Sequence, residues 1–535
     1  MPVPEITNRS NRLDAKTSTA LFRLVVTFLL CVSASAAAAS LWWPLSWDEG
    51  VFAWIGGIVA RGGTPYVDAW DVKGPIAYFG YALANVLFGT NAYGVRILDL
   101  LLTLTGSFVV FRILVPLTNV RAATIGSLML LVSVLAQGYN VNGQPDLWAS
   151  WCLVFIVSLV TVPASLGRIF LASMFLGVAV LIKPVYAPLG MLIVLPVIYT
   201  CRTHWMSYTK YAGTIAVGIF VPIAVCVAWF WSRGAADALF DGYIKFNVQS
   251  ASANARTLDG VTAALIQYLQ DRRAVVLSLP AIVIGLLGTF RWSDSVIPIW
   301  KIRLFTVWLV TLFALVILQN RWWAYHWTST YPPLAIAACI GFYRLSTLQQ
   351  IGRIGRLPQY GVAALVAIVA VGASLVPFQH ISRVIRLVTH RITRDEYLEA
   401  FNDYPGVYTA RDVANSAAYI AAHTGPDDYV FVWEDPNINV LSGRRTPSRF
   451  ALWTPLMPLT AAALTPLYER NRVEFFRAMG ERPPALVLVE RATWKDGLAH
   501  TMAYIPAKFP EFVDWIDQRY VESDTVGAFL VFKRR

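Results

Sequence analysis

The stretch that decides the fold is LSWDEGVFAWIGGIVARGGTPYVDAWDVKGP, residues 45–75, which lies between two long apolar runs. Only 14 % of the 535 residues are charged, yet this loop collects charges of both signs. Those charged residues are Asp48, Glu49, Arg61, Asp68, Asp71 and Lys73. A loop that only connects two helices needs turn residues and a few solvated charges. The number of charged residues in this loop therefore indicates a functional segment.

The composition around the loop is that of an integral membrane protein. Hydrophobic residues make up 56 % of the chain, and many apolar runs approach the length of about 20 residues that crosses a bilayer. The net charge is +12, but the basic residues lie between apolar runs, and no basic–aromatic groove, zinc-finger spacing or phosphate-binding glycine loop occurs. Nucleic acid is therefore not an expected partner. The five cysteines lie in or beside apolar runs, which argues against a disulfide framework or a cysteine-based metal site.

The apolar runs predict about eleven transmembrane helices. They are expected near 21–41, 93–115, 121–136, 147–163, 168–183, 185–200, 210–231, 274–290, 303–319, 332–344 and 360–377. The first run resembles a secretory signal, but the many spans that follow favour a retained helix. Residues 76–90 are short for a span and predict an interfacial or re-entrant helix.

Charge between the spans predicts their orientation. With a cytoplasmic N-terminus, nearly all inside connections are rich in Lys and Arg, as the positive-inside rule requires. We expect a cytoplasmic tail over 1–20, a membrane domain over 21–378 with a first outer loop at 42–92, and an extracytoplasmic domain over 379–535. The setting we expect is the bacterial inner (plasma) membrane. Every unusual polar cluster then faces the outside, which predicts an active site on that face.

Beyond residue 379 the apolar runs shorten and charge rises. A helix is expected over RDVANSAAYIAAH (411–423), and buried strands over YVFVW (429–433) and ALVLVE (485–490). A second helix, interrupted by proline, is expected over 460–480, and a last strand over 526–535. The fold class predicted is a polytopic α-helical membrane protein with a C-terminal extracytoplasmic α/β domain.

Several outer-face residues are candidates for chemistry, each with a plainer alternative. Asp48 and Glu49 follow the first span, where an acidic pair is costly unless it faces a cavity, although Asp48 could simply cap a helix starting near Val51. Lys73 and Lys183 could hold a lipid phosphate or merely reach the headgroups.

Two further candidates are more ambiguous. Asp146 opens the fourth span and could cap its helix. His326 lies in an aromatic cluster and could be structural, and no second histidine stands at metal-ligand spacing. Together the candidates describe one reaction, in which an outside acid deprotonates an acceptor hydroxyl and lysines hold a leaving lipid phosphate.

Five segments and one lysine resemble the GT-C glycosyltransferases of the protein O-mannosyltransferase and lipid A aminoarabinose transferase type. The lysine is Lys183, which follows the fifth span. The segments are the acidic pair 48–49, GGTPYVDAWDVKGPIAYF (62–79), LFGTNAYGVRILDLL (87–101), YHWTSTYPPLAIAACIGF (325–342) and VFVWEDPNINVLSGRRTPSRF (430–450). Two details depart from the family pattern, since KGP replaces KPP and HW replaces HY. The donor contacts are therefore expected to differ in detail.

The resemblance implies a role for each candidate. Asp48 would be the catalytic base, Glu49 would shape the site or coordinate a neighbour, and Asp146 would orient the acceptor or the base. The residues that would contact the donor phosphate or its sugar are Lys73, Lys183, Arg61 and His326. The activity implied is inverting transfer of a sugar from a polyprenyl-phosphate donor to a hydroxyl of a glycan, lipid or protein acceptor.

Two other function classes remain open at this stage. A transporter or flippase of a lipid-linked sugar would carry polar groups at mid-membrane depth, whereas most charges here fall at span ends. An envelope assembly protein would use the α/β domain as a binding module and would not need Asp48. The acidic pair also leaves open whether a divalent cation assists, and the sugar, the acceptor and the prenyl chain are not encoded in any motif.

Overall fold

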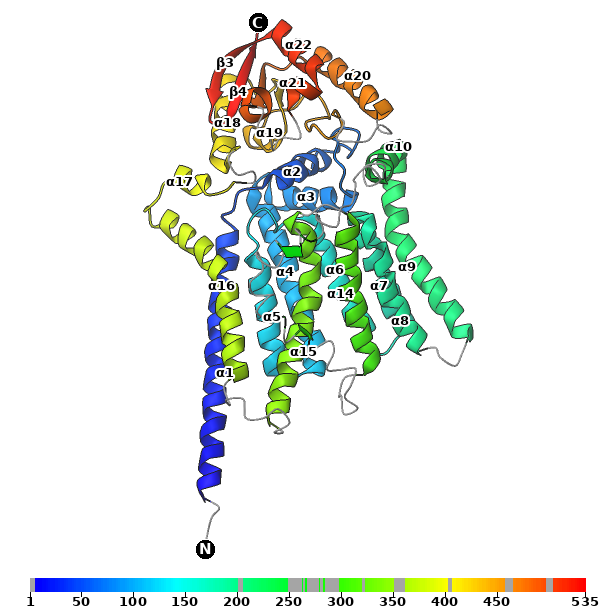
Figure 1. Cartoon of the computed structure of the whole chain (residues 1–535). Helices are drawn as coiled ribbons and strands as arrows, with labels where there is room; N and C mark the ends of the chain where they lie inside the picture. The colour runs from blue at the N-terminus through cyan, green and yellow to red at the C-terminus, as the bar shows by residue number, and fades with distance from the viewer. Residues whose placement is uncertain are drawn as a thin grey trace.

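The computed structural model describes residues 5–200, 205–248, 298–319, 323–350, 361–402, 407–457, 465–496 and 504–535, and a few single residues between 262 and 283. Upright helices form the lower part of the molecule, with the N-terminus at the bottom and the C-terminal domain above (Figure 1). The predicted combination of a helical membrane domain and a C-terminal α/β domain is confirmed.

The upright helices follow the apolar runs of the sequence. They are α1 (Glu5–Ser40), α4 (Ala92–Leu114), α5 (Val120–Leu135), α6 (Pro145–Val160), α7 (Leu166–Ile182), α8 (Met191–Thr200), α9 (Trp205–Ser232), α14 (Ile299–Gln319), α15 (Tyr331–Gln350) and α16 (Gly361–Val388). Within the described residues, five helices are long and apolar enough to cross a membrane, and shorter apolar helices pack beside them. The span expected at 274–290 lies outside the described residues except for three single positions, so the total of eleven stays a prediction.

Two apolar helices lie across the upper ends of the upright helices (Figure 1). These are α2 (Trp47–Ala60) and α3 (Pro75–Phe88), which pack against each other. The placement of α3 agrees with the interfacial helix expected at 76–90. The helix expected near Val51 begins earlier, because Ser46 is its N-cap and Asp48 lies in its first turn. The plainer reading of Asp48 as an N-cap is therefore wrong.

The C-terminal domain is a sheet between two helical layers. Its strands are β1 (Val430–Val432), β2 (Leu486–Glu490), β3 (Tyr520–Val526) and β4 (Phe529–Arg534), in the order β1-β2-β4-β3. The pair β1–β2 is parallel and the other two pairs are antiparallel. Side chains alternate between the faces of a strand, so Phe431 packs with the aromatic cluster on one face and Val430 with Ile420 on the other.

The helices of this domain close both faces of the sheet. They are α18 (Ala410–His423), α19 (Asn437–Ser442), α20 (Thr465–Glu481), α21 (Ile505–Lys508) and α22 (Pro510–Arg519), while α17 (Arg394–Glu399) packs instead with Trp43 and Tyr139. The helix expected at 411–423 and the strands expected in the buried runs are confirmed. The strand β3 was not expected, because five of its seven residues are exposed and polar side chains predominate.

Three short helical segments connect these parts. They are η2 (Pro184–Gly190), the pair α10 (Ala236–Leu239) with η3 (Phe240–Lys245), and η4 (Ala324–Thr330). The segment η4 precedes α15 and carries Tyr325 and His326 to the upper end of the bundle.

The C-terminal domain packs directly on α2. A Cβ atom on Gly50 would stand 2.5 Å from the Cβ of Asn437, so the backbones of α2 and α19 approach too closely for a larger residue. At the start of α2 the indole of Trp47 donates a hydrogen bond to the carbonyl of Glu434 at 2.5 Å. The C-terminal domain thus holds Trp47, the residue that precedes Asp48.

A buried acidic group at this junction predicts a pH-dependent stability. Burial, reinforced by the nearby Asp435, raises the pKa of Glu490 to about 8 from 4.5. The folded state therefore binds more protons than the unfolded state between about pH 4.5 and 8, and stability falls as pH rises through this window. We expect the melting temperature of the full chain to be lower at pH 9 than at pH 5. Glu490→Gln should reduce this difference but not abolish it, because burial also raises the pKa values of Glu434 and Glu49. The matched control is Glu511→Gln, on the surface of the same domain, which should leave the pH dependence of the melting temperature unchanged. If Glu490→Gln also left it unchanged, Glu490 would not be a source of this pH dependence.

Candidate active site

The acidic pair at the start of α2 divides into two different environments. Asp48 is half-buried, and its Oδ2 accepts a hydrogen bond from Nε2 of Gln144 at 3.1 Å. Glu49 is fully buried, and its two carboxylate oxygens bind the guanidinium of Arg96 at 2.6 and 2.7 Å. The adjacent acids therefore point to different partners. Asp48 is the one that retains access to a substrate.

Arg96 joins three segments around Glu49. Besides its ion pair, it donates hydrogen bonds to the carbonyls of Pro44, Asn142 and Tyr139 at 2.5, 3.2 and 3.4 Å. The end of α1, the start of α2 and the loop before α6 are thus tied to one guanidinium. Because that loop also carries Gln144, Arg96 fixes both Asp48 and the side chain that orients it.

Glu49 also stabilises the start of its own helix. Its Oε2 accepts a hydrogen bond from the backbone amide of Ser46 at 2.8 Å, as in a capping box. Burial raises the pKa of Glu49 to about 7, although Arg96 and the Ser46 amide act in the opposite direction. These contacts indicate that Glu49 positions the site, and a contact with substrate is not needed to explain its burial.

Lys73 lies just before α3, close to several acidic groups. Its Nζ is 3.3 Å from the hydroxyl of Tyr325 and 4.6 Å from the centre of that ring. Burial lowers the pKa of Lys73, but the neighbouring Tyr325, Asp48, Asp146 and Asp71 outweigh it and raise the net pKa. Lys73 therefore stays a cation beside Asp48.

The loop backbone that carries Lys73 is held rigidly. The carbonyl of Lys73 accepts hydrogen bonds from the hydroxyls of Tyr66 at 2.6 Å and Tyr78 at 3.2 Å. Gly74 approaches the end of α7 so closely that a Cβ atom would stand 2.0 Å from the carbonyl oxygen of Leu181. This packing brings the first loop against the point where Lys183 follows α7.

Asp146 and Lys183 form a second charged pair near Lys73. Lys183 is the C-cap of α7, and its Nζ is 2.9 Å from Oδ1 of Asp146. The hydroxyl of Tyr186 donates to the same oxygen at 3.0 Å, while the buried Oδ2 has no hydrogen-bond partner among the described residues. The N-cap of α6 is Gln144, so capping does not explain Asp146.

The structure brings together most of the residues predicted for the site. Asp146 interacts electrostatically with His326, Lys73 and Lys183, and the His326 ring contacts that of Tyr325 edge to face at 4.7 Å between centroids. Arg61 is not part of this cluster. It is the exposed C-cap of α2, about 20 Å along the helix from Asp48 at 1.5 Å per residue.

Several residues of the site were not singled out by sequence. They are Arg96, Gln144, Tyr186, Tyr325 and the loop tyrosines Tyr66 and Tyr78. The signal available for Arg96 was its place in the apolar helix α4, next to the buried Asp99, which accepts a hydrogen bond from Trp148. Charged residues inside apolar helices mark functional sites by default. The other residues are ordinary in their sequence context.

The site combines a candidate base, Asp48, with a cation, Lys73, and a second acid, Asp146. Within the described residues no group of three or more His, Cys, Asp or Glu side chains is placed to hold a metal ion. The cations Lys73 and Lys183 lie where a phosphate would need charge compensation, and Asp48 lies where a hydroxyl would need a proton acceptor. This set suits transfer of a group away from a phosphate.

The chain resembles known proteins in part of its sequence and in its fold. Residues 72–229 match the model of a family described as dolichyl-phosphate-mannose-protein mannosyltransferase. The crystal structure of apo ArnT from Cupriavidus metallidurans has a TM-score of 0.63 at 14 % identity, covering 96 % of this chain and 98 % of that one. The structure of the same protein bound to undecaprenyl phosphate has a TM-score of 0.62 at 16 % identity, covering 95 % and 97 %. No curated protein matches the chain.

At such identities the structural likeness establishes the fold, and the family match covers residues 72–229. The predicted resemblance to GT-C glycosyltransferases is therefore confirmed. The many apolar helices and this fold make the chain a multi-pass membrane protein. The family match over residues 72–229 and the ArnT-like fold together indicate a glycosyltransferase.

Proposed function

We propose that the protein transfers a sugar from a polyprenyl-phosphate donor to an acceptor hydroxyl at the outer face of the bacterial inner membrane. The observation that carries this proposal is the convergence of Asp48, Lys73 and the Asp146–Lys183 pair at the upper end of the helical bundle. The positive-inside pattern places this end, and the C-terminal domain above it, outside the cytoplasm. Water-soluble nucleotide sugars are not expected there, whereas a lipid-linked donor is presented by the membrane itself.

The reaction we propose is a single displacement with inversion at the anomeric carbon. The acceptor oxygen forms a bond to the anomeric carbon as its proton passes to Oδ1 of Asp48. The bond between that carbon and the phosphate oxygen breaks, and its electron pair leaves with the lipid phosphate. Lys73 and Lys183 stabilise the charge that develops on the phosphate, so the leaving group needs no proton.

The remaining polar groups orient these participants. Gln144 holds Oδ2 of Asp48, which leaves Oδ1 directed to the acceptor. Asp146 fixes Lys183 through its Oδ1, and its Oδ2 is available to accept a hydrogen bond from a sugar hydroxyl. His326 lies beside Asp146 and is placed for the sugar or the phosphate.

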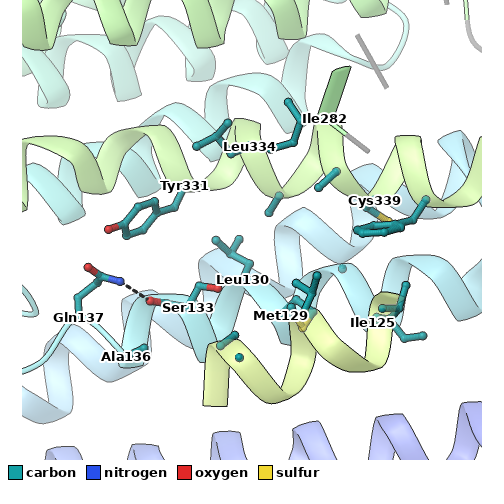
Figure 2. Close-up of a pocket in the computed structure, with 18 of the residues that line it drawn as sticks. Ile125, Met129, Leu130, Ser133, Ala136, Gln137, Ile282, Tyr331, Leu334 and Cys339 are labelled. Atoms are coloured by element: carbon teal, nitrogen blue, oxygen red, sulfur yellow. Dashed lines mark hydrogen bonds between the residues drawn. The ribbon is translucent and has the colours of Figure 1, made fainter. Parts of the chain in front are cut away.

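A mostly apolar cavity of about 750 Å³ lies between α5, α15 and α16, and we assign it to the prenyl chain of the donor. Figure 2 shows Leu130, Met129 and Leu334 lining it between the helices, with Gln137 and Tyr331 towards one end. Ala324, next to the lysine partner Tyr325, also lines the cavity. One part of the cavity wall is thus adjacent in sequence to the residue that contacts Lys73, the proposed phosphate anchor.

The proposal is tested by offering proteoliposomes a panel of polyprenyl-phosphate sugars together with membrane extract as the source of acceptor. We expect one donor to lose its sugar to the acceptor. Donors that cross the bilayer unconsumed would favour the transporter alternative, and a panel left wholly intact by an otherwise folded protein would contradict the proposal.

In the same assay, Lys73→Gln should lower kcat/KM for that donor by about 10- to 100-fold, because a charge-assisted contact to phosphate is worth roughly 1.5–3 kcal/mol. The matched control is Lys495→Gln, whose amine binds Glu522 on the surface of the C-terminal domain. It should leave kcat/KM unchanged. Equal values for the two variants would remove Lys73 from the phosphate site.

A further inference from the structure

A second cavity, of about 290 Å³, lies where the first outer loop, the α10–η3 segment and the C-terminal domain meet. The loop contributes Tyr66, the segment contributes Asp237 and Asp241, and α20 contributes Arg470 and Glu474. The two sides are joined by an ion pair between Arg470 and Asp241 at 3.3 Å. Figure 1 shows α10 directly below α20 at this junction.

The charges around this cavity nearly cancel. Arg449, which also lines it, binds both oxygens of Glu474 at 2.6 and 2.7 Å. With Arg470 the cavity has two guanidinium groups, against the three carboxylates of Asp237, Asp241 and Glu474. A phosphate or a polyanion would meet no net positive field here. The lining instead combines guanidinium donors with carboxylate acceptors, a combination that can also bind the hydroxyls of a neutral polyol, each of which donates and accepts hydrogen bonds.

The size of the cavity limits what it can hold. Small-molecule sites commonly occupy roughly 300–1,000 Å³, so a cavity of about 290 Å³ suits one small unit rather than a folded partner. Asp237 is exposed at its edge and makes no side-chain hydrogen bond or ion pair with the described residues, which leaves a carboxylate for a ligand.

The cavity is connected to the candidate active site through one loop. Arg449 donates a hydrogen bond to the carbonyl of Tyr66, and the amide of Trp70 donates to the carbonyl of Arg449 at 3.0 Å. The hydroxyl of Tyr66 in turn holds the carbonyl of Lys73 at 2.6 Å. The same loop therefore forms a wall of the cavity and carries the proposed phosphate anchor, on the side of the loop that faces the C-terminal domain.

We propose that this cavity is a subsite for a neutral saccharide unit of the acceptor, beyond the hydroxyl that receives the sugar. The assignment to the acceptor rests on the proposed transferase function, because the donor is expected to enter from the membrane side. The assignment to a carbohydrate rests only on the charges of the residues that line the cavity and on its volume. An acceptor that is itself a glycan would then be held at two points, one beside Asp48 and one beside Asp237.

Saturation-transfer-difference NMR on the full-length protein in nanodiscs tests the subsite without any donor. The probes are the methyl glycosides of mannose, glucose, galactose and N-acetylglucosamine, together with an unglycosylated threonine-containing pentapeptide. Asp237→Trp places a bulky side chain over the cavity, and Arg470→Ala opens its ion pair. The control is Asp427→Trp, which makes the same change at an exposed residue elsewhere on the C-terminal domain. Melting temperatures establish that each variant is folded.

We expect at least one methyl glycoside to show saturation transfer that falls fivefold or more in Asp237→Trp, weakens in Arg470→Ala and persists in Asp427→Trp. No sugar signal in the wild type, or a signal equal in all four proteins, overturns the subsite. A signal from the peptide alone that Asp237→Trp removes also overturns it, in favour of a peptide site. Donor consumption by the same preparations separates the two proposals: sugar binding without any donor turnover leaves the subsite standing and rejects the transferase function.

Discussion

Asp48→Asn is expected to lower sugar transfer by about 100- to 10,000-fold while the protein stays folded. The substituted amide occupies the same volume, and its oxygen can still accept the hydrogen bond that Gln144 donates to Oδ2. What is lost is the capacity to take a proton from the acceptor hydroxyl. The measurement is the initial rate of donor consumption in proteoliposomes, at saturating and at subsaturating donor.

The control for this substitution lies in the same outer loop. Asp68 is exposed, and its Oδ2 accepts a hydrogen bond from the amide of Thr64 at 2.7 Å, a bond that Asn can also accept. Asp68→Asn should therefore retain nearly full activity. An Asp48→Asn protein that keeps more than a tenth of the wild-type rate would exclude Asp48 as the base, and the base would then be sought at Asp146.

The donor dependence distinguishes a base from a binding group. Loss of the base should reduce kcat with little change in KM for the donor, because Asp48 is proposed to act on the acceptor oxygen. Loss of Lys73 should affect donor binding as well. The two substitutions therefore report on different steps even though the side chains are electrostatically coupled.

The fold could be predicted from sequence largely because a bilayer imposes strong constraints. Apolar runs near the length of a span, and basic loops between them, predict most upright helices within a few residues. The largest exceptions are α1, which begins at Glu5 and not near 21, and α16, which continues to Val388 and not to 377. The strand β3 could not be predicted this way, since an edge strand with five exposed residues has no hydrophobic alternation to detect. The buried strands β1 and β2 were detectable because nearly every residue in them is apolar.

The candidate site was predictable only in part. Asp48, Lys73, Asp146, Lys183 and His326 stood out because polar residues at the outer ends of apolar runs are unusual. Their partners did not stand out, because each contact joins residues far apart in the chain: Gln144 meets Asp48, and Tyr325 meets Lys73, only in three dimensions. Arg61 is near Asp48 in sequence, but Asp48 lies in the first turn of α2 and Arg61 is the C-cap at the other end.

The largest effect on stability is expected from Arg96→Met. This change leaves the Glu49 carboxylate buried without its counter-ion and removes the donor shared by three backbone carbonyls. Breaking one side of a buried ion pair typically costs about 3–5 kcal/mol. We expect a clear fall in melting temperature in detergent and loss of transfer activity, because the start of α2 and the loop carrying Gln144 would no longer be fixed.

A double-mutant cycle separates the ion pair from its surroundings. Glu49→Gln leaves Arg96 without its charge partner, so it should also destabilise the protein, whereas Glu49→Gln combined with Arg96→Met should cost less than the sum of the two single changes. Arg445→Met is the surface control, since Arg445 and Asp427 are 3.3 Å apart and largely exposed, and such pairs contribute at most about 1 kcal/mol. Strictly additive effects in the cycle would mean that Glu49 and Arg96 act independently.

The double variant also decides whether the pair serves stability alone. With both charges removed, no buried charge is left unpaired, but the carbonyls of Pro44, Asn142 and Tyr139 still lack the donor that Arg96 supplies. If Arg96 positions the site as proposed, transfer should remain impaired in the double variant even at temperatures where it is fully folded. Wild-type kcat in a stable double variant would show instead that Asp48 and Gln144 are held by packing, and that Arg96 only neutralises Glu49.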